Sequence, residues 1–554
     1  MMERSPQTTP PLSPPVDDAA QDRRRQAGRA GVVGSATMTS RILGLFREHV
    51  FAKLFGTDAL SDAFVMAYRI PNLLRDLFAE GALSSAFVPS FAECREQRGQ
   101  AAAFRLAQTL FSFIFLVVGA LTVAGVVFAP QIVNFIAPGF QHVIESQTTP
   151  GGGVAQRDTT IRLTQILMPF LLLVSLAAAC RGILNSYHRY FLPAVSPALF
   201  NLVAVITGLG MYWAGMPPET AVYGWALATL GGGLVQLLIQ LPAVRTLGLR
   251  LRPAFAFRDP SFRRLLKLLL PATLGLAAVQ VNVLVNSVLA SLLTEGSATW
   301  LQLAFRLVYL PIGVVGVAVA TVASVNLSAL AAKRDMDRFR TDLMAAVRLV
   351  AFLTIPASVG LIVLGQPIVR LIYEYGRFSA ESTTPTALAL GGYSLGLVFY
   401  SAIKTLAPAL YALDRVRAPM LASVAGVAVN VVWSLLTYRT FGVAALAIGT
   451  SLAALVNCAV LAVALRRELG GSGPRDLSTP VTLAKTLALG VLMGVIVSYS
   501  HDALVSVLGS QSFLARATAI SLCIVVGTLV MGLGGVALRV PEARDLWATI
   551  RRRA

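Results

Sequence analysis

Long apolar runs separated by short polar stretches dominate the chain. Runs near 20 residues recur from Ala30 to Leu538, and about 20 apolar residues are needed for an α-helix to cross a bilayer. Short alternating segments, which are typical of membrane β-barrels, do not occur. We therefore predict an all-α polytopic membrane protein with fourteen transmembrane helices. Their approximate ranges are 30–56, 61–92, 103–136, 158–186, 190–214, 219–244, 264–294, 298–331, 341–369, 382–413, 417–438, 441–465, 480–503 and 514–538.

The polar stretches between these runs differ in charge. Every second connection is basic, and the connections between them, such as 138–157, 215–220 and 294–299, are nearly free of cations. Basic loops stay in the cytoplasm, so both termini are expected there. The basic positions include Arg23–Arg25, Arg95, Arg181, Arg250, Lys333, Arg415, Arg466 and Arg551–Arg553. Four arginines fall on the neutral side and are exceptions: Arg370, Arg377, Arg439 and Arg516.

Weak internal repeats suggest how the helices are grouped. Leu184–Pro193 returns as Leu410–Pro419, and Ala67–Ile70 returns as Ala304–Leu307. We infer two six-helix lobes related by a pseudo-two-fold axis along the membrane normal, plus two C-terminal helices. Transporters of this build hold their substrate between lobes that rock against each other. The predicted divisions are a disordered cytoplasmic tail at 1–29, an N-terminal lobe at 30–246, a C-terminal lobe at 247–466, and helices 13 and 14 with a basic tail at 467–554.

Composition supports the membrane interpretation and excludes several others. Of the 554 residues 56% are hydrophobic and 13% are charged, about half the charged fraction of a soluble protein. The net charge of +19 lies in short loops and tails, so no nucleic-acid partner is expected. The four cysteines are scattered and have no clustered histidine, so no metal site is predicted. No phosphate-binding GxxxxGK[ST] loop occurs, which argues against ATP as the driving force.

The stretch from Thr39 to Glu93 is unusual because its two apolar segments carry many charges. These charges are Arg41, Arg47, Glu48, Asp62, Arg69, Arg75, Asp76 and Glu80. A charge at the centre of a membrane helix costs roughly 2.5–3.5 kcal/mol. Such residues therefore usually face a wet cavity or one another, and they mark a transport path. Gly44, Pro71, Gly81 and Pro89 interrupt these segments, and we expect them to act as hinges.

Helical spacing sorts the charges into roles. Asp62, Arg69, Asp76 and Glu80 fall near one stripe of the second segment, and Arg41 and Glu48 share a stripe of the first. Arg47 and Arg75 point elsewhere. We expect Asp62, Arg69, Asp76, Glu80 and Glu48 to form a gating or charge network, with ordinary intramembrane salt bridges as the alternative for Arg69, Asp76 and Glu80.

Four arginines outnumber the acids that could pair with them: Arg41, Arg47, Arg75 and Arg306. Arginines without a carboxylate partner in a cavity suit an anion, and the planar guanidinium group matches phosphate in two-point contact. The predicted substrate is therefore a phosphate or pyrophosphate on an amphiphile, and these four residues are the predicted substrate-binding residues.

Three segments closely resemble the MurJ (MviN) lipid II flippases of bacteria, which belong to the multidrug/oligosaccharidyl-lipid/polysaccharide exporter superfamily. They are SRILGLFRE, TDALSDAFVMAYRIPNLLRDLFAEGALSSAFVP and RLVYLPIGVVGVAVAT. The resemblance implies a transporter in the bacterial cytoplasmic (inner) membrane that takes part in peptidoglycan biosynthesis and so in cell wall biogenesis and cell shape. Its cargo would be undecaprenyl-pyrophosphate-linked precursor, moved to the outer leaflet by alternating access.

The resemblance also implies roles for residues. The family's essential cavity arginines match Arg41, Arg47, Arg75 and Arg306, and its essential acids match Asp62 and Glu80. The last two spans match the pair associated with the polyprenyl tail. The implied partners are lipid II or a similar polyprenyl-pyrophosphate amphiphile, membrane lipids and cell-wall synthesis proteins.

Three positions depart from the family pattern. Phe305 precedes Arg306 where some members have an acid, and Asn286 and Ser434 stand where sodium-binding members carry aspartates. Oxygen ligands without a carboxylate bind a cation weakly. We therefore expect no tight sodium site, and we expect Asn286 and Asn430 to hydrogen-bond between helices. No cofactor is expected, and the membrane potential is the expected driving force, with the coupling ion left open.

Other functions remain open at this point. The chain could flip another polyprenyl-linked oligosaccharide, or it could be a drug/cation antiporter of the same fold, although an antiporter should carry cavity acids for cationic drugs. A membrane enzyme acting on polyprenyl phosphates would need clustered carboxylates such as DDxxD, which are absent. A scaffold for wall-synthesis enzymes would not need its buried arginines.

Overall fold

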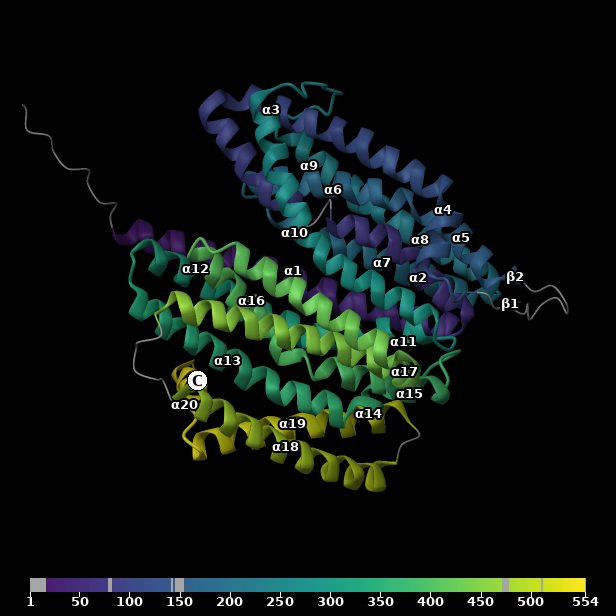
Figure 1. Cartoon of the computed structure of the whole chain (residues 1–554), viewed down its shortest axis with the longest axis vertical. Coiled ribbons are helices and arrows are strands. Elements are labelled where there is room, and N and C mark those ends of the chain that lie inside the picture. Colours follow the sequence, from purple (N-terminus) through teal and green to yellow (C-terminus); the bar gives the residue numbers. More distant parts are fainter. Residues whose placement is uncertain are drawn as a thin grey trace, which may run out of the picture.

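The fold is built almost entirely of helices (Figure 1). The computed structural model describes residues 16–77, 82–140, 143–144, 154–470, 478–509 and 512–553. Within them the only sheet is an antiparallel ladder of two two-residue strands, β1 (Val143–Ile144) and β2 (Val154–Ala155). The prediction of an all-helical protein is therefore confirmed.

Several helices of the first half follow one another almost directly. They are α1 (Val16–Phe55), α2 (Ala59–Arg75), α3 (Ala82–Val127), α4 (Ala129–Ile136), α5 (Gln156–Leu167), α6 (Pro169–Ser186), α7 (Phe191–Trp213), α8 (Pro218–Leu238) and α9 (Gln240–Thr246).

The second half and the C-terminal part are also built of helices that follow one another closely. Their helices are α10 (Pro260–Ser291), α11 (Ser297–Pro311), the π-helix η2 (Ile312–Gly316), α12 (Val317–Ala332), α13 (Met336–Val363), α14 (Gly365–Tyr373), α15 (Ala380–Ser394), α16 (Leu397–Ala412), α17 (Arg417–Glu468), α18 (Ser478–Leu508), α19 (Phe513–Ala537) and α20 (Pro541–Arg553).

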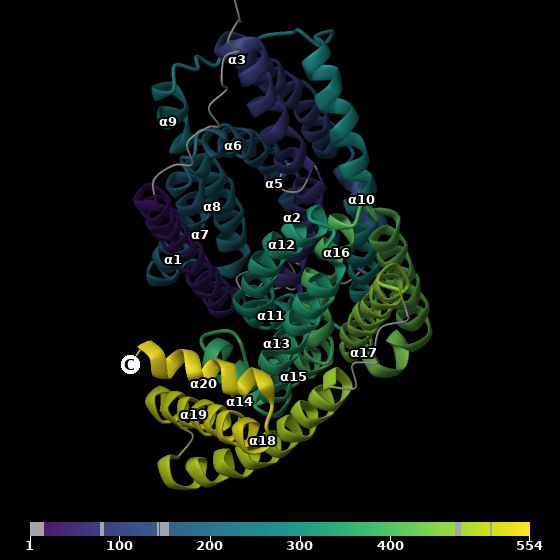
Figure 2. The same cartoon turned by 90° about the vertical axis from the view of Figure 1, so that its left-hand side faces the viewer.

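The helices gather into two groups with two helices added at one side. In Figure 2 the purple and blue helices of the first half lie to one side of the teal and green helices α11 to α17, and the yellow α18 and α19 lie beyond α13. Helix α10 packs against both α3 and α17, and so connects the groups. The two-fold relation between the lobes, and their boundaries at 246 and 466, stay predictions.

Ten helical stretches of the described residues are long and apolar enough to cross a membrane. One of them, Arg417–Glu468, covers two of the predicted spans, while α1, α2 and α10 are not among the ten. The chain is thus a multi-pass membrane protein, and the count of fourteen remains a prediction. Large apolar side chains face outward along the helices, as expected for contact with lipid: Trp213, Leu436, Tyr499 and Val507 are at least three-quarters exposed.

The N-terminal tail differs from its prediction. Helix α1 begins at Val16, so residues 16–29, which we expected to be disordered, continue the first membrane helix towards the N-terminus. Pro15 directly precedes this helix and no proline interrupts it.

Polar residues set the ends of several helices. Asp58 accepts hydrogen bonds from the backbone N–H groups of Leu60 and Ser61 and so caps α2. Asp259 caps α10, where Pro260 occupies the first helical position. Asp335 and Ser512 cap α13 and α19 in the same way.

Breaks inside the helices lie at glycines that were not predicted. Gly99 has φ 81° inside α3, and Gly442 has φ 56° inside α17; only glycine adopts such angles without strain. The predicted hinges Gly44, Pro71 and Pro89 lie inside α1, α2 and α3, and Gly81 lies outside the described residues. The hinge role of these four residues stays a prediction.

Candidate functional site

Two arginines cross between the halves of the protein. Arg41 of α1 extends to the π-helix η2, where a Cβ at Gly313 would lie 1.2 Å from its Nη1 atom. Arg306 of α11 extends in the opposite direction, and a Cβ at Gly44 would lie 2.6 Å from its Nη2 atom. Each guanidinium group therefore occupies space that a side chain would otherwise fill. We call Arg41 and Arg306 the crossed arginines.

The crossed arginines have no carboxylate partner in the described part of the chain. Among the ion pairs of the described residues, none involves either of them. Nη1 of Arg41 is buried and has no hydrogen-bond partner in this part of the chain. Its guanidinium carbon lies 5.8 Å from the centre of the Tyr309 ring, where a cation–π contact stabilises the charge. Arg41 is half-buried, and a guanidinium group with a buried, unsatisfied donor and no ion pair in the described chain favours binding of an anion.

Arg47 and Arg75 behave differently, because each pairs with the acid that follows it. Nη2 of Arg47 lies 2.5 Å from Oε1 of Glu48, and Nη2 of Arg75 lies 2.8 Å from Oδ1 of Asp76. Adjacent residues on a helix point apart, which led us to expect no such contact. The long arginine side chains bend along the helix surface and close the gap. Of the four predicted substrate-binding arginines, only the crossed arginines have no ion pair among the described residues.

Asp62 connects the first half to the second at the start of α11. Its side chain is 2% exposed. It accepts hydrogen bonds from the backbone N–H of Gly296 (2.8 Å), the backbone N–H of Thr299 (2.9 Å) and the Thr299 hydroxyl (2.7 Å). A carboxylate at the N-terminus of a helix satisfies free N–H groups and complements the helix dipole.

Two other acids make similar contacts. Gln302 Nε2 of α11 donates to Glu48 Oε2 at 3.3 Å, and Gln280 Nε2 of α10 donates to Asp76 Oδ2 at 3.5 Å. Asp62, Glu48 and Asp76 therefore each accept hydrogen bonds from neutral donors of the second half. We call these three residues the acceptor acids.

The remaining members of the predicted charge network are less connected. Arg69 lies on α2, and its buried Nε has no hydrogen-bond partner in the described chain. Its predicted pairing with Asp76 is not among the ion pairs there, because Asp76 pairs with Arg75. Glu80 lies outside the described residues.

The halves are joined at the end of the molecule that carries β1, β2 and α14, which corresponds to the neutral side of the sequence (Figure 1). The hydroxyl groups of Thr57 and Ser382 lie 2.6 Å apart. The backbone N–H of Arg377 donates to the carbonyl of Lys53 at 3.1 Å, and its guanidinium group lies 3.8 Å from Asp58. We call this region, together with the Asp62 contacts, the neutral-end closure.

The positions at which sodium-binding relatives carry aspartates form a neutral amide cluster instead. Asn430 donates to Asn282 and, at 2.9 Å, to Asn286; Asn286 donates to Thr450 at 2.9 Å; and Ser434 donates to Asn430 at 3.2 Å. The side-chain oxygens of these three asparagines accept N–H or O–H donors, and no carboxylate is present. Uncharged oxygen ligands that already accept hydrogen bonds bind a cation only weakly, so these residues offer no tight sodium site. The expected hydrogen bonds between helices are confirmed.

No group of three or more histidine, cysteine or acidic residues that could hold a metal occurs in the described part of the chain. The sequence analysis missed the second half's contribution to the site, which consists of Gly313, Gln280, Gln302 and Thr299. Pro311 followed by Gly313 and Gly316 was the available indication that this helix is irregular. The uncharged donors could not be identified, because neutral polar residues are common in membrane helices.

Comparison with known proteins identifies the family of the chain. A family model described as lipid II flippase MurJ matches residues 51–520. A probable lipid II flippase MurJ of Rhizobium meliloti is 34% identical over 514 residues, which cover 91% of this chain and 94% of that protein. The lipid II flippase MurJ of Burkholderia cenocepacia is 31% identical over 440 residues, 79% of this chain and 83% of that protein.

Solved structures show the same relationship. One described as lipid II flippase MurJ in an inward closed conformation has a TM-score of 0.75 and 26% identity, and covers 93% of this chain and 99% of that chain. An inward-facing multidrug resistance transporter of the MATE family has a TM-score of 0.63 at 16% identity, covers 79% of this chain and 98% of that chain, and shares the fold. With most of its length matched by the family model and by curated relatives, the chain belongs to the MurJ lipid II flippase family.

Proposed function

We propose that this protein carries lipid II, an undecaprenyl-pyrophosphate-linked peptidoglycan precursor, from the cytoplasmic to the outer leaflet of the bacterial inner membrane. The protein is a transporter and not an enzyme, as the names of its relatives state. The observation that carries the proposal for this chain is the pair of crossed arginines, which come from opposite halves and lack a carboxylate partner in the described structure.

The pyrophosphate would bind to the crossed arginines. A guanidinium group offers two parallel N–H donors to phosphate oxygens, and a diphosphate offers enough oxygens for both arginines at once. Arg47 and Arg75 are held by Glu48 and Asp76, and they would join the site by exchanging part of that contact for phosphate. Because the crossed arginines come from different halves, bound pyrophosphate would contact both halves at once.

Alternating access is the mechanism that we propose for release. The neutral-end closure seals one side while the halves remain in contact there, so substrate would enter from the basic side, which faces the cytoplasm together with both termini. Opening of this closure, with closing at the basic side, would expose the headgroup to the outside. The fourteen-helix, two-lobe arrangement supplies the two bodies that move.

The membrane potential is the proposed source of direction. Moving one elementary charge across 100 mV is worth about 2.3 kcal/mol. With the cytoplasm negative, export of the anionic headgroup runs downhill. Return of the empty cationic site inward is favoured for the same reason.

Complementation of a flippase-depleted bacterium tests the proposal. We expect Arg41→Ala and Arg306→Ala to fail, and the exposed control Arg105→Ala to support growth. Arg75→Lys keeps the charge but loses the planar group, and it should be impaired if two-point phosphate recognition holds. Full growth with both crossed-arginine variants would instead support a scaffold.

Measuring exposure of lipid II at the outer leaflet, with and without an ionophore that collapses the potential, tests the transport step directly. Exposure that continues unchanged without a potential would refute the proposed driving force. If the protein were instead an antiporter of the same fold, it would export cationic drugs, and its loss would leave lipid II exposure unchanged.

A further inference from the structure

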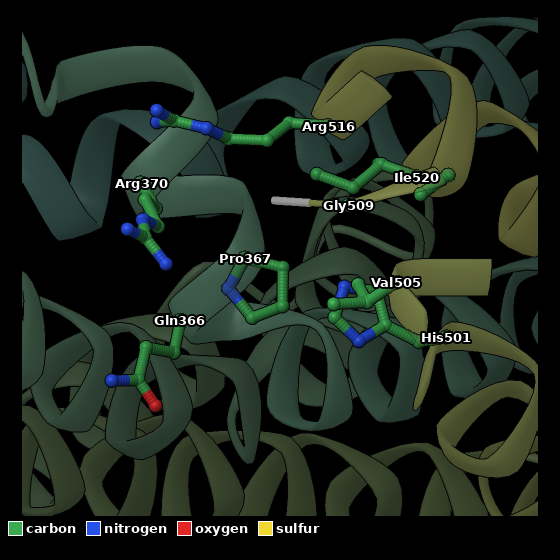
Figure 3. Close-up of a pocket in the computed structure, with 9 residues that line it drawn as sticks. Gln366, Pro367, Arg370, His501, Val505, Gly509, Arg516 and Ile520 are labelled. Carbon is green, nitrogen blue, oxygen red and sulfur yellow. The ribbon is translucent and has the colours of Figure 1, made fainter. Parts of the chain in front are cut away.

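A cavity of about 310 Å³ lies between α14, α18 and α19, away from the crossed arginines (Figure 3). It is at the neutral end, since α14 leads into the neutral-end closure and α18 ends at the cavity. Its polar lining comes from Arg370, Arg516, His501 and Gln366, and the rest is apolar. Its volume lies at the lower limit for a small-ligand pocket.

Cations at this end are exceptional. Arginines are few on the neutral side of the sequence, and two of them, Arg370 and Arg516, line this one cavity. The positive-inside rule accounts for arginines on the cytoplasmic side of the membrane and not on the outer side. Two arginines in one outer-side cavity therefore need another explanation. In Figure 3 the side chains of Arg370 and Arg516 lie on the same side of the cavity.

The position of Arg370 is fixed by a carboxylate outside the cavity lining. Its Nε lies 3.0 Å from Oε1 of Glu374, and the other oxygen of Glu374 accepts a hydrogen bond from Thr383 at 2.9 Å. Glu374 therefore holds the guanidinium group by one edge. A guanidinium group has five N–H donors, so donors remain for a ligand.

The acid nearest to His501 points to solvent. Asp502 lies 3.7 Å from the ring of His501, and its side chain is 80% exposed. No acidic residue lines the cavity itself. The lining is therefore positive, and the site favours an anion.

The remaining walls indicate that the anion carries an apolar chain. Pro367, Val505, Ala519 and Ile520 also line the cavity. α18 and α19 continue from it along the membrane with large exposed apolar side chains, among them Tyr499, Leu522 and Leu529. A free phosphate ion would leave these walls uncovered, whereas a lipid would place its headgroup at the arginines and its acyl chains along the helices.

We propose that this cavity binds the phosphate group of an anionic phospholipid in the outer leaflet, through Arg370 and Arg516. The site is separate from the proposed pyrophosphate site and does not depend on it. A lipid held there would connect α14, which touches α1 and so the neutral-end closure, to the C-terminal pair α18 and α19.

The test is native mass spectrometry of the full-length, delipidated protein with added dioleoylphosphatidylglycerol. Parallel samples receive dioleoylphosphatidylethanolamine or inorganic phosphate. The variants are the double substitution Arg370→Gln with Arg516→Gln, the cavity-filling Val505→Phe, and the control Arg439→Gln. Arg439 is an arginine of the same neutral side that stacks on Tyr438 and lies outside the cavity lining.

We expect at least about ten-fold weaker retention of phosphatidylglycerol by the double variant, a similar loss in Val505→Phe, and no change in Arg439→Gln. Phosphatidylethanolamine should bind more weakly than phosphatidylglycerol to the unmodified protein. Equal phosphatidylglycerol retention by the unmodified protein and both cavity variants would overturn the proposal. So would displacement of the lipid by an equal concentration of inorganic phosphate, which would identify a free-anion site. Melting temperatures identify any variant that is unfolded, and Val505→Phe tests the site without changing its charge.

Discussion

Substituting Gly313 by alanine tests whether the position of the Arg41 guanidinium group matters. The new Cβ would lie 1.2 Å from Nη1 of Arg41, so that nitrogen must move by at least 2.2 Å to reach an ordinary 3.4 Å contact. The same substitution at Gly44 requires Nη2 of Arg306 to move by only 0.8 Å from its 2.6 Å separation. At Gly360 of α13 no atom lies within 4 Å of the new Cβ, which makes Gly360→Ala the matched control.

In Gly313→Ala, the higher helix propensity of alanine should raise stability, whereas displacement of Arg41 should weaken substrate binding. An alanine in place of a glycine inside a helix stabilises it by roughly 0.5–1 kcal/mol. Loss of one hydrogen bond between a charged pair costs about 1.5–3 kcal/mol, or roughly ten-fold to a hundred-fold in binding. We therefore expect Gly313→Ala to keep or raise the melting temperature and to lower lipid II exposure at the outer leaflet about ten-fold or more. The decrease at Gly44→Ala should be smaller, and Gly360→Ala should be fully active.

The assay is lipid II exposure in cells, with thermal melting of each purified variant. A double-mutant cycle separates the cause: in an Arg41→Ala background, Gly313→Ala should have no further effect, because the group that it displaces is gone. Full activity of a folded Gly313→Ala variant would show that Arg41 does not need its present position. A decrease of equal size in the Arg41→Ala background would show that Gly313 acts through packing alone.

Three further predictions follow from the site and its supports. Asp62→Asn weakens the cap on α11, and we expect faster labelling of cysteines introduced at the neutral-end closure; unchanged labelling would exclude Asp62 as a gate residue. Replacement of sodium by choline in the assay buffer should leave lipid II exposure unchanged, since the amide cluster offers no carboxylate, and a sodium requirement would refute this. Glu542→Gln removes the buried partner of Arg348, 2.7 Å away, and should cost about 3 kcal/mol of stability; an unchanged melting temperature would show that α20 is held by other contacts.

The sequence was sufficient to predict the helical class, because hydrophobic period and length determine it. It also identified the charged stretch of α1 and α2, since charges inside apolar runs are conspicuous. The sequence alone could not show which of the four predicted substrate-binding arginines pair with a carboxylate and which do not. Whether an arginine reaches a carboxylate depends on its rotamer, and the pairs of Arg47 with Glu48 and Arg75 with Asp76 join adjacent residues that helical geometry places apart.

The contacts that the second half makes with the site also could not be predicted from the sequence. Gly313 matters because of what lies opposite it, and the sequence does not show which glycine faces an arginine. Gln280 and Gln302 lie more than 200 residues from the acids that they contact. Helix breaks at Gly99 and Gly442 instead of at the prolines show the same limitation, since a proline at the right position in a helix is tolerated when neighbouring helices satisfy the freed carbonyl.

The acceptor acids have a consequence for the work of separating the halves. Glu48 and Asp76 each keep an arginine of their own half, Arg47 and Arg75, while their contacts across the interface come from uncharged amides. Parting the halves at these two acids therefore does not separate Glu48 from Arg47 or Asp76 from Arg75, so it avoids the cost of about 3–5 kcal/mol for breaking a buried ion pair there. Incoming water can take over the role of each amide, so solvent can release these two contacts while both carboxylates keep their own arginine.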